Sequence, residues 1–325
     1  MIGARRSDVL QGPAFGFDFG LIEIGKGRAM AVSTDPIWIE RSYGLANAAW
    51  FAFHTIVGDV ALSGLKPSHL ALDWNLPQSL TAADALTMMR VFGLEAKKLG
   101  MTVVTGHTGV YDGASLPTIG GGTAFAVGRR KDVILPSGST PGDLVVITKG
   151  PAVETAVYLC YRYRRSMEKL IGPGSVERIR HLLHSMSVVG DAIIASAVRG
   201  VTAMHDASER GIAAAMNEMS VLSGCGFELC SEEMYLHPSV EELTESLSLD
   251  PLSCSSEGTL LITVRPESAH RLVDGLRKKG IVSHEAGIVT LGGGVKLTGK
   301  GRSSRLRPPS RDHLLDAIEK LSGSH

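Results

Sequence analysis

Four short motifs place acidic or polar side chains beside glycine or at the end of an apolar run. They are Ser33-Thr34-Asp35, Gly58-Asp59-Val60-Ala61-Leu62-Ser63-Gly64, Thr105-Gly106-His107-Thr108 and Met204-His205-Asp206-Ala207-Ser208-Glu209-Arg210-Gly211. Carboxylate oxygens are the hard ligands that suit Mg²⁺, and glycines let the backbone approach a phosphate closely. The motifs therefore predict a site that holds a divalent cation and phosphate groups.

Three aspartates are the metal-ligand candidates. Asp35 precedes Pro36, which lacks a backbone N–H, so we expect Asp35 at a strand end, where an ordinary turn is the alternative. Asp59 falls near the C-terminus of an apolar helix, where the helix dipole disfavours a carboxylate by ~0.3–1 kcal/mol. Either a bound cation or an ion pair with Lys66 would explain Asp59. Asp18 lies in a glycine-flanked loop at positions 15–20, which alone is typical of many turns.

The chain contains neither G-x-x-x-x-G-K-[ST] nor G-x-G-x-x-G. Phosphate binding would therefore have to come through carboxylates and Mg²⁺, as it does where a metal bridges the phosphates of ATP.

The pair Asp206 and Glu209 has the spacing of a capping box, with Asp at the N-cap and Glu at N3 of the following helix. Such a box stabilises a helix without any chemistry, and it is compatible with a place beside an active site, so both interpretations stay open. His205, at the end of a buried strand, is typical of a core residue.

Two basic clusters, at 161–165 and at Arg302, Arg305 and Arg307, are the candidate nucleic-acid contacts. The first falls on a predicted helix, which favours packed tyrosines and solvated arginines, and the second falls in a predicted loop. Lys and Arg number 33 and Asp and Glu number 33, so the net charge of zero argues against a broad nucleic-acid footprint. His181 and His184 lack a carboxylate that would complete a metal set.

Length and composition predict a soluble, cytoplasmic protein of two domains. The chain has 325 residues, of which 44% are hydrophobic and 20% charged. Its four cysteines form no CxxC pair, which argues against structural zinc and favours free thiols. We expect no signal peptide and no apolar stretch of the ~18–20 residues that cross a bilayer.

The elements that would position the motifs alternate between strands and helices, which predicts a mixed α/β (α+β) fold. Paired strands flank the turn at 25–27, a helix covers 43–63, and a second helix runs from the Thr81 cap to Gly100. Charge and turn formers at 128–142 predict a boundary between domains 1–138 and 139–325. In the second domain Pro151 suits a helix first turn, and a last helix starts near Asp312.

The motifs and their order resemble the PurM-like ATP-using enzymes, which include aminoimidazole ribonucleotide synthetase, selenophosphate synthetase, thiamine-monophosphate kinase and the hydrogenase-maturation dehydratase. The last, HypE-like, branch looks closest, because Asp250-Pro251-Leu252 and Ser256-Glu257-Gly258-Thr259-Leu260 are also similar to it. The resemblance covers about 16–297. It implies an N-terminal ATP- and Mg²⁺-binding domain that forms a homodimer through its sheet, and a C-terminal α/β domain.

The resemblance also implies roles for single residues. Asp18, Asp35 and Asp59 fall where the family binds magnesium and ATP phosphates, and Gly106 and Thr108 are further cofactor-binding candidates. The candidate catalytic residues are His107, near the phosphates, and Asp206 and Glu209, at the second-domain side of the cleft. The implied activity is phosphoryl transfer to a small carbonyl or carboxamide acceptor, followed by dehydration or ring closure. A small-molecule kinase, or a non-catalytic nucleotide-binding dimer with a possible protein partner, is the alternative.

Three positions depart from the family pattern. His107 stands where Asp or Glu is usual, and imidazole is a poor magnesium ligand. Arg210 replaces a glycine. The last residues, 321–325, lack the cysteine that carries the substrate in the hydrogenase-maturation enzyme, so we expect a different acceptor or loss of catalysis.

Overall fold

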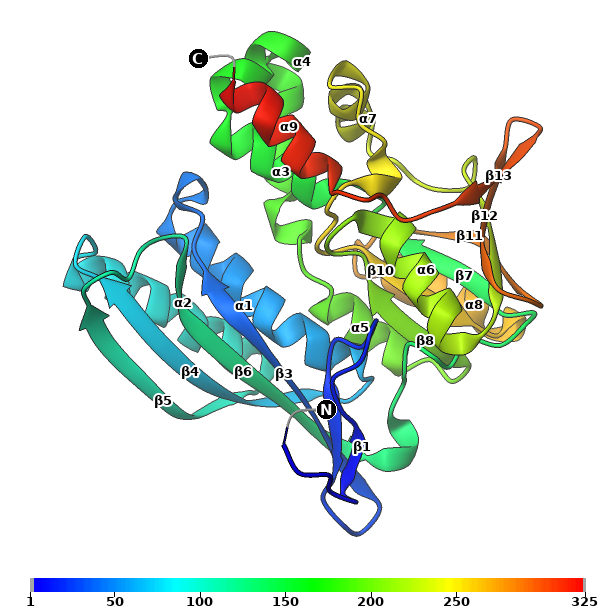
Figure 1. Ribbon diagram of the computed structural model, residues 1–325, viewed down its shortest axis with the longest axis horizontal. Coiled ribbons are helices and arrows are strands. Elements are labelled where there is room, and N and C mark those ends of the chain that lie inside the picture. The colour runs from blue at the N-terminus through cyan, green and yellow to red at the C-terminus, as the bar shows by residue number, and fades with distance from the viewer. Residues whose placement is uncertain (1–2, 324–325) are drawn as a thin grey trace. The chain divides into compact units, whose positions relative to one another are not determined.

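The computed structural model describes residues 3–323 and divides the chain into two compact units (Figure 1). Unit 1 extends to Val133 and unit 2 begins at Ile134. Ser324 and His325, part of the C-terminal segment considered above, lie outside the described residues.

Unit 1 is built on a six-stranded sheet in the order β1-β2-β3-β6-β4-β5. Neighbouring strands are antiparallel except β4 and β5, which are parallel. The strands are β1 (Val9–Gln11), β2 (Gly20–Glu23), β3 (Arg28–Trp38), β4 (Pro67–Pro77), β5 (Thr102–Tyr111) and β6 (Thr118–Arg129), and the helices are α1 (Leu45–Leu62), α2 (Ala82–Leu99) and the short 3-10 turns η1 (Arg41–Tyr43) and η2 (Arg130–Asp132).

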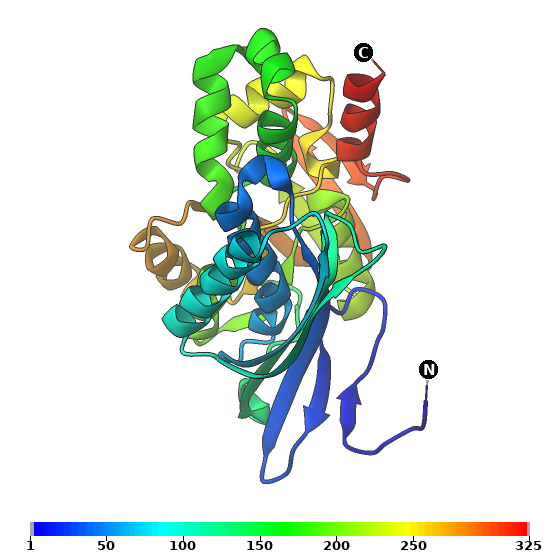
Figure 2. The same ribbon diagram turned by 90° about the vertical axis from the view of Figure 1, so that its left-hand side faces the viewer.

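Both long helices of unit 1 pack on the same face of this sheet, as Figure 2 shows from the side. Phe92 of α2 contacts Phe53 of α1 and Trp74 of β4, with ring centroids 5.5 and 4.9 Å apart. The predicted start and end of α2 are confirmed: Thr81 and Asp84 form a capping box, and Gly100 ends the helix in the left-handed conformation.

Helix α1 corrects one expectation from the sequence. Its 18 residues have a mean hydropathy of 1.3, so a stretch of membrane-spanning length and composition does occur. It is 67% buried within the structure, as the core helix of a globular unit is. Its apolar character is therefore explained by packing against β3 and β6.

Unit 2 has a seven-stranded sheet in the order β13-β12-β9-β11-β7-β10-β8, in which only β9 and β12 pair in parallel. The strands are β7 (Leu144–Thr148), β8 (Val201–Asp206), β9 (Gly226–Cys230), β10 (Leu260–Val264), β11 (Ser283–Thr290), β12 (Gly294–Gly299) and β13 (Arg302–Leu306). The helices are α3 (Val153–Arg162), α4 (Arg164–Arg180), α5 (Val189–Ser196), α6 (Gly211–Ser223), α7 (Pro238–Ser246), α8 (Pro266–Arg277) and α9 (His313–Ser322), with 3-10 turns η3 (His181–Ser185) and η4 (Pro251–Ser253).

The central strands of unit 2 are covered on both faces, with α6 on one side and α5 and α8 on the other (Figure 1). Every residue of β10 is buried, which is expected for a strand packed on two sides. On β7, Val145 and Ile147 face the α6 core, where they join Met216 and Met219.

Three local expectations were wrong in unit 2. Pro151 is not in a helix first turn, because Lys149, Gly150 and Ala152 have positive φ angles and α3 begins only at Val153. Arg302 and Arg305 lie in β13, a strand rather than a loop. The capping box expected at Asp206 and Glu209 is absent, because α6 begins only at Gly211.

Candidate active site

Asp35 lies inside a strand rather than at its end, which corrects the sequence prediction. β3 continues through Pro36 to Trp38, and Asp35 is paired with Gly122 of β6. Pro36 is tolerated because the register shifts between Pro36 and Trp38, where the ladder is irregular. Asp35 is half-buried and lies two residues from both Ser33 and Ile37, which are buried, so its side chain shares their helix-covered face of the sheet.

Asp59 lies on α1, one turn beyond Ile56, and is also half-buried. The Ser33 hydroxyl donates to the Ile56 carbonyl oxygen (3.5 Å), so Asp35 and Asp59 are on elements in direct contact. Asp18 is half-buried in the loop before β2, next to the buried Phe19.

The donor set suits Mg²⁺ because all three groups are carboxylates, its preferred kind of ligand. Within residues 3–133, however, Asp18, Asp35 and Asp59 do not bring their oxygens together as one group within 4.8 Å. A cation held by more than one of them would need water or phosphate oxygens to complete its shell, which Mg²⁺ accepts because it retains several waters.

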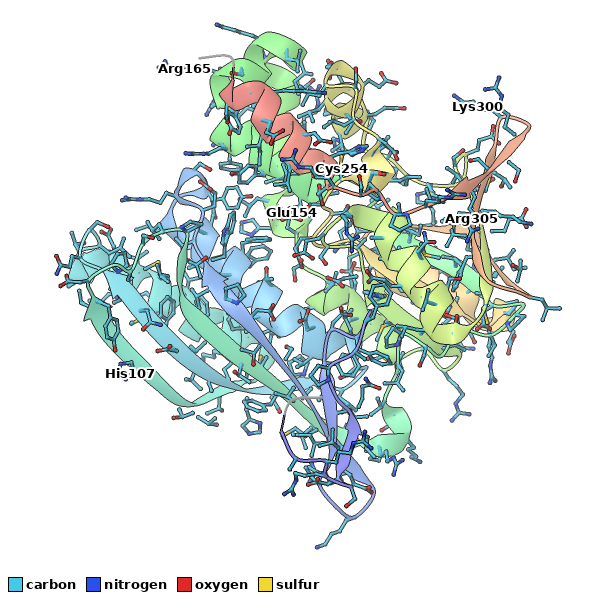
Figure 3. The ribbon with its side chains drawn as sticks, in the orientation of Figure 1. His107, Glu154, Arg165, Cys254, Lys300 and Arg305 are labelled. Carbon is cyan, nitrogen blue, oxygen red and sulfur yellow. The ribbon has the colours of Figure 1, made fainter. Side chains whose placement is uncertain are left out.

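His107 lies on β5, the edge strand of the unit 1 sheet, and is exposed (Figure 3). Its Nε2 is 2.6 Å from the Tyr111 hydroxyl. The β4–β5 register pairs His107 with Asp73, so both side chains project from the same face, opposite the buried Trp74. The motif 105–108 thus lies within a strand, and Tyr111 and Asp73 are polar neighbours that its local sequence does not reveal.

The two flanking members of that motif differ in their constraints. A Cβ on Gly106 would lie 2.5 Å from the Leu72 carbonyl oxygen, so only glycine fits where β5 approaches β4. Thr108 is exposed. Close strand packing therefore accounts for Gly106 in this structure.

Asp206 and Glu209 do not form a capping box. Asp206 is the last residue of β8, and α6 begins only at Gly211, with Arg210 at its N-cap and no side-chain cap. Positive φ angles at Arg210 (59°) and Gly211 (61°) turn the chain between the strand and the helix. Helix capping therefore does not explain why these two carboxylates are present. Asp206 is buried, Glu209 is exposed, and neither caps α6.

Arg210, at the position where the resemblance implies glycine, has the left-handed conformation that glycine would adopt readily. Its guanidinium lies 3.9 Å from Glu218 on α6. A Cβ on the next residue, Gly211, would lie 2.3 Å from the Cys254 carbonyl oxygen, so the backbone of this turn packs against the segment at 252–254.

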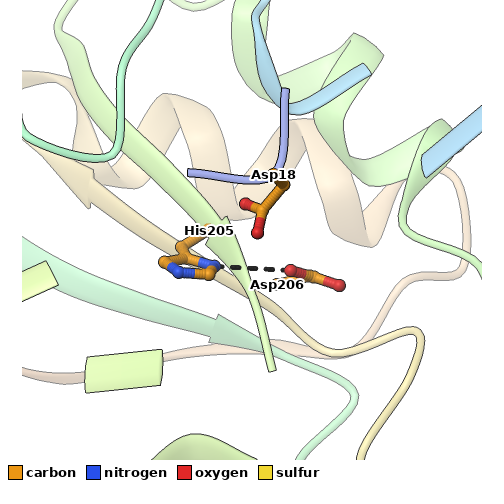
Figure 4. A group of neighbouring side chains, drawn as sticks. All are labelled: Asp18, His205 and Asp206. Carbon is orange, nitrogen blue, oxygen red and sulfur yellow. Dashed lines mark hydrogen bonds and ion pairs between the residues drawn. The ribbon is translucent and has the colours of Figure 1, made fainter. Parts of the chain in front are cut away.

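His205 lies between two carboxylates, as Figure 4 shows for Asp206. Its Nδ1 is 3.3 Å from Asp206 Oδ1, and its Nε2 is 3.1 Å from Glu218 Oε2. The hydrogen bond with His205 lowers the pKa of Glu218, and the charges of His205 and Arg210 add to that shift. The prediction that His205 is a hydrogen-bonded buried residue agrees with its 3% exposure.

Glu154, in the first turn of α3, is a candidate that sequence reasoning missed (Figure 3). Its Oε2 accepts a hydrogen bond from the Glu257 backbone N–H (3.0 Å). Burial raises the pKa of Glu154 to about 7, the Glu257 N–H opposes that shift, and the carboxylates of Glu209, Asp312 and Asp206 reinforce it. A carboxyl group that titrates near neutral pH can accept or release a proton under physiological conditions.

The remaining clusters have structural explanations. Burial raises the pKa of the Cys254 thiol to about 12, which argues against a nucleophilic cysteine there. The Arg180 guanidinium lies 4.3 Å from the Tyr161 ring centroid, and Arg164 pairs with Glu168 and Glu177. The four cysteines are free, as expected.

Comparison with known proteins identifies the family of both domains. The N-terminal domain of AIR synthase related proteins matches residues 16–129, and their C-terminal domain matches residues 140–300. Carbamoyl dehydratase HypE from Bradyrhizobium diazoefficiens is 25% identical over 276 residues, which cover 81% of this chain and 74% of the relative.

Solved structures show the same fold. The hydrogenase maturation protein HypE from Escherichia coli has a TM-score of 0.75 at 24% identity, with 86% of each chain covered. HypE in complex with ATP has a TM-score of 0.70 at 19% identity, covering 97% of this chain and 90% of the other. Thiamine-monophosphate kinase from Aquifex aeolicus has a TM-score of 0.66 at 19% identity, covering 86% and 91%.

The two domain matches together span most of the chain, and the relative from Bradyrhizobium diazoefficiens is a HypE protein. The chain belongs to the AIR synthase related, PurM-like family of ATP-using enzymes, and within it to the HypE-like branch.

Proposed function

We propose that this protein is an ATP- and Mg²⁺-dependent enzyme that activates a small carbonyl or carboxamide acceptor by phosphoryl transfer. The acceptor oxygen attacks the γ-phosphorus, ADP leaves, and the phosphorylated oxygen then departs as inorganic phosphate when the acceptor is dehydrated or cyclised. The name of the relative, carbamoyl dehydratase, supports dehydration of a carboxamide-type group.

The observation that carries the proposal is the conformation of the turn at 206–211. Asp206 and Glu209 would be ordinary capping residues in a capping box, but the structure gives them no capping role. Both carboxylates, moreover, act on the pKa of Glu154, which comes from a different segment. Three acidic groups from two distant segments thus form one electrostatic cluster in unit 2.

In unit 1 we assign metal and phosphate binding to Asp18, Asp35 and Asp59, with His107, Gly106 and Thr108 near the phosphates. When bound, Mg²⁺ would neutralise charge on the transferring phosphoryl group. The protein's own carboxylates would hold the ion and fix its position, since positioning is the main contribution of the protein in phosphoryl transfer.

In unit 2 we assign proton exchange to the cluster of Asp206, Glu209 and Glu154. Loss of an acceptor oxygen as phosphate is accompanied by loss of a proton from the acceptor. A carboxylate with a pKa of about 7 is suited to take that proton near neutral pH.

A small-molecule kinase that stops after phosphoryl transfer is the second candidate. The two departures at His107 and Arg210 favour a third, a dimer that binds nucleotide without turnover. Arg210 introduces a cation 3.9 Å from Glu218, at the turn that the proposal uses.

A homodimer through the unit 1 sheet is part of the proposal. Its support is β5, an edge strand on which Val103, Val104, Val110 and Tyr111 are all more than 40% exposed. An apolar edge strand of this kind is suited to pairing with another strand. A structure of a HypE–HypF complex supports a protein partner as well.

Two measurements test the activity. Calorimetric titration of the purified protein with Mg-ATP is expected to show saturable binding that EDTA abolishes, and absence of binding sinks the proposal. Incubation with ATP and a series of carboxamides should then release phosphate and a dehydrated product. A stable phosphorylated product would identify the kinase, and binding without any product would identify the non-catalytic dimer.

A further inference from the structure

Asp312 connects three segments of unit 2 that are far apart in the sequence. It is 7% exposed and directly precedes the C-terminal helix α9. Its carboxylate accepts hydrogen bonds from four donors: the backbone N–H groups of Arg210, Ser255 and Leu314, and the Ser255 hydroxyl.

Only one of these four bonds is needed to cap α9. The Leu314 N–H donates to Oδ1 (2.8 Å), which is the ordinary N-cap bond. The other three hold the turn that carries Asp206 and Glu209, through Arg210, and the segment that carries Glu257, through Ser255. The Ser255 hydroxyl bond is 2.7 Å and the Ser255 N–H bond is 3.1 Å.

The Ser255 segment leads directly to Glu154. Thr155 donates to the Ser255 carbonyl oxygen through both its backbone N–H (3.2 Å) and its hydroxyl (2.9 Å). Two residues after Ser255, the Glu257 N–H donates to the Glu154 carboxylate. The position of that donor, and so the setting of the Glu154 carboxyl, depends on a segment that Asp312 anchors.

We infer that Asp312 is a positioning residue, through which the start of the C-terminal helix fixes the Asp206–Arg210 turn and the Ser255–Glu257 segment around the Glu154 carboxylate. The expected effect of Asp312 on turnover rests on the proposed function. Its effect on the positions of the two segments does not depend on any activity.

The variant Asp312→Asn separates the two roles of this side chain. Asparagine is as good an N-cap as aspartate, so its remaining oxygen can still accept from Leu314 and Ser255 N–H. Its NH₂ group, at the place of Oδ2, cannot accept from the Arg210 N–H. Asp250→Asn is the matched control, because Asp250 also caps a short helix beside this segment, accepting from Leu252 N–H and the Ser253 hydroxyl.

Hydrogen exchange of the full-length protein, read by mass spectrometry, is the first measurement. In Asp312→Asn, exchange is expected to accelerate in peptides covering 207–212 and 254–258, while 313–322 keeps its protection. Asp250→Asn should leave 207–212 unchanged. Acceleration confined to 313–322 would mean that Asp312 only caps α9, and the inference would be overturned.

Turnover at several pH values is the second measurement. Asp312→Asn is expected to lower kcat by about 10- to 100-fold, as a small misplacement of catalytic groups does, with unchanged Mg-ATP affinity and a shifted pH midpoint. An unchanged pH profile together with unchanged kcat contradicts the inference. Absence of turnover in the unaltered protein contradicts the proposed function instead, while the exchange result still decides the role of Asp312.

Discussion

Glu154 illustrates how a single carboxyl group acquires chemistry from its surroundings. It is a half-buried side chain in the first turn of α3, where the helix dipole favours its charged form. Burial and three nearby carboxylates outweigh that effect and the Glu257 N–H, and raise its pKa to about 7. Because the pKa is raised above the ordinary value of 4.5, the folded state favours the protonated form.

The substitution Glu154→Gln tests this shift through stability. The contribution of Glu154 to the free energy of unfolding is fully present below about pH 4.5. It is lost as the pH rises through about 7, because the ionised form is disfavoured only in the folded state. The variant should therefore be more stable than the unaltered protein at pH 8 by about 1–3 kcal/mol, with little difference at pH 4.5. Urea unfolding at the two pH values measures this, with Glu285→Gln, at an exposed position of β11, as the control. A constant difference between the proteins would refute the raised pKa.

At position 107 we expect a substitution to increase the affinity for Mg-ATP. His107→Asp introduces the hard oxygen ligand that the family resemblance implies at this position, and it removes the contact with Tyr111. The affinity for Mg-ATP should increase by about tenfold, or about 1.4 kcal/mol. Calorimetry with and without Mg²⁺ measures it, and His107→Asn controls for loss of the imidazole. Equal affinity in the two variants would show that position 107 does not contact the metal.

Among the elements, the turn from β8 to α6 is tightly packed against its neighbours. Both ends of α6 have glycine with a positive φ, Gly211 at 61° and Gly224 at 69°. A Cβ on Gly224 meets nothing within 4 Å, whereas a Cβ on Gly211 meets the carbonyl oxygens of Cys254 and Leu252 at 2.3 and 2.9 Å. Both positions have the left-handed backbone conformation that strains a non-glycine residue, and they differ only in the room available for a Cβ atom.

Alanine at these two positions should therefore give unequal effects. Gly224→Ala should cost about 1 kcal/mol of unfolding free energy, the strain of a left-handed alanine. Gly211→Ala should cost at least about 2 kcal/mol more, because carbonyl oxygens must move, and it should also lower turnover. Urea unfolding compares the two variants. Equal destabilisation would mean that the turn at 206–211 is not packed against 252–254.

The edge strand β5 makes the assembly testable. Val110 is 64% exposed on this strand, and lysine at a sheet edge discourages pairing with another chain. Val110→Lys should convert the proposed dimer into a monomer at micromolar concentration, measured by light scattering after gel filtration. Leu94→Lys, at a 53% exposed position of α2, should leave the dimer intact. A dimer that survives Val110→Lys, or one that Leu94→Lys also disrupts, would place the interface elsewhere.

For the molecule as a whole, the sequence predicted what local signals determine. The Thr81 cap, the stop at Gly100 and the start of α9 at Asp312 each depend on residues within one turn, and all three are present. The expectation of two domains followed from the length of the chain and from the charge and turn formers at 128–142. β9, α7 and β13 were missed because their short sequences carry little periodicity.

The details of the candidate site depended on contacts that no local pattern contains. A positive φ at a non-glycine residue, as at Arg210, is uncommon, so a capping box was the better local interpretation of Asp206 and Glu209. Glu154 meets its donor across 103 residues of sequence, and Asp312 meets Arg210 across 102. Tertiary packing decided these positions, against a plausible local pattern.

In the proposed reaction unit 1 binds the nucleotide and unit 2 acts on the acceptor, and these two contributions can be measured separately. Asp35, within unit 1, is assigned to the metal and the phosphates, and Asp206, within unit 2, to the acceptor. Asp35→Asn should weaken Mg-ATP binding by at least about tenfold, because one charged contact contributes about 1.5–3 kcal/mol. Asp206→Asn should bind Mg-ATP normally and lose about 100-fold or more in kcat, the usual effect of removing a group that moves a proton.

Calorimetry and phosphate release, applied to both variants and to the double variant, separate binding from chemistry. If Asp206→Asn abolishes nucleotide binding as strongly as Asp35→Asn does, the assignment of the two carboxylates to different steps is wrong. If neither variant changes binding or turnover, these motifs do not carry the activity. Only a loss of affinity in one variant and a loss of rate in the other agrees with a nucleotide bound by unit 1 and an acceptor processed by the acidic cluster of unit 2.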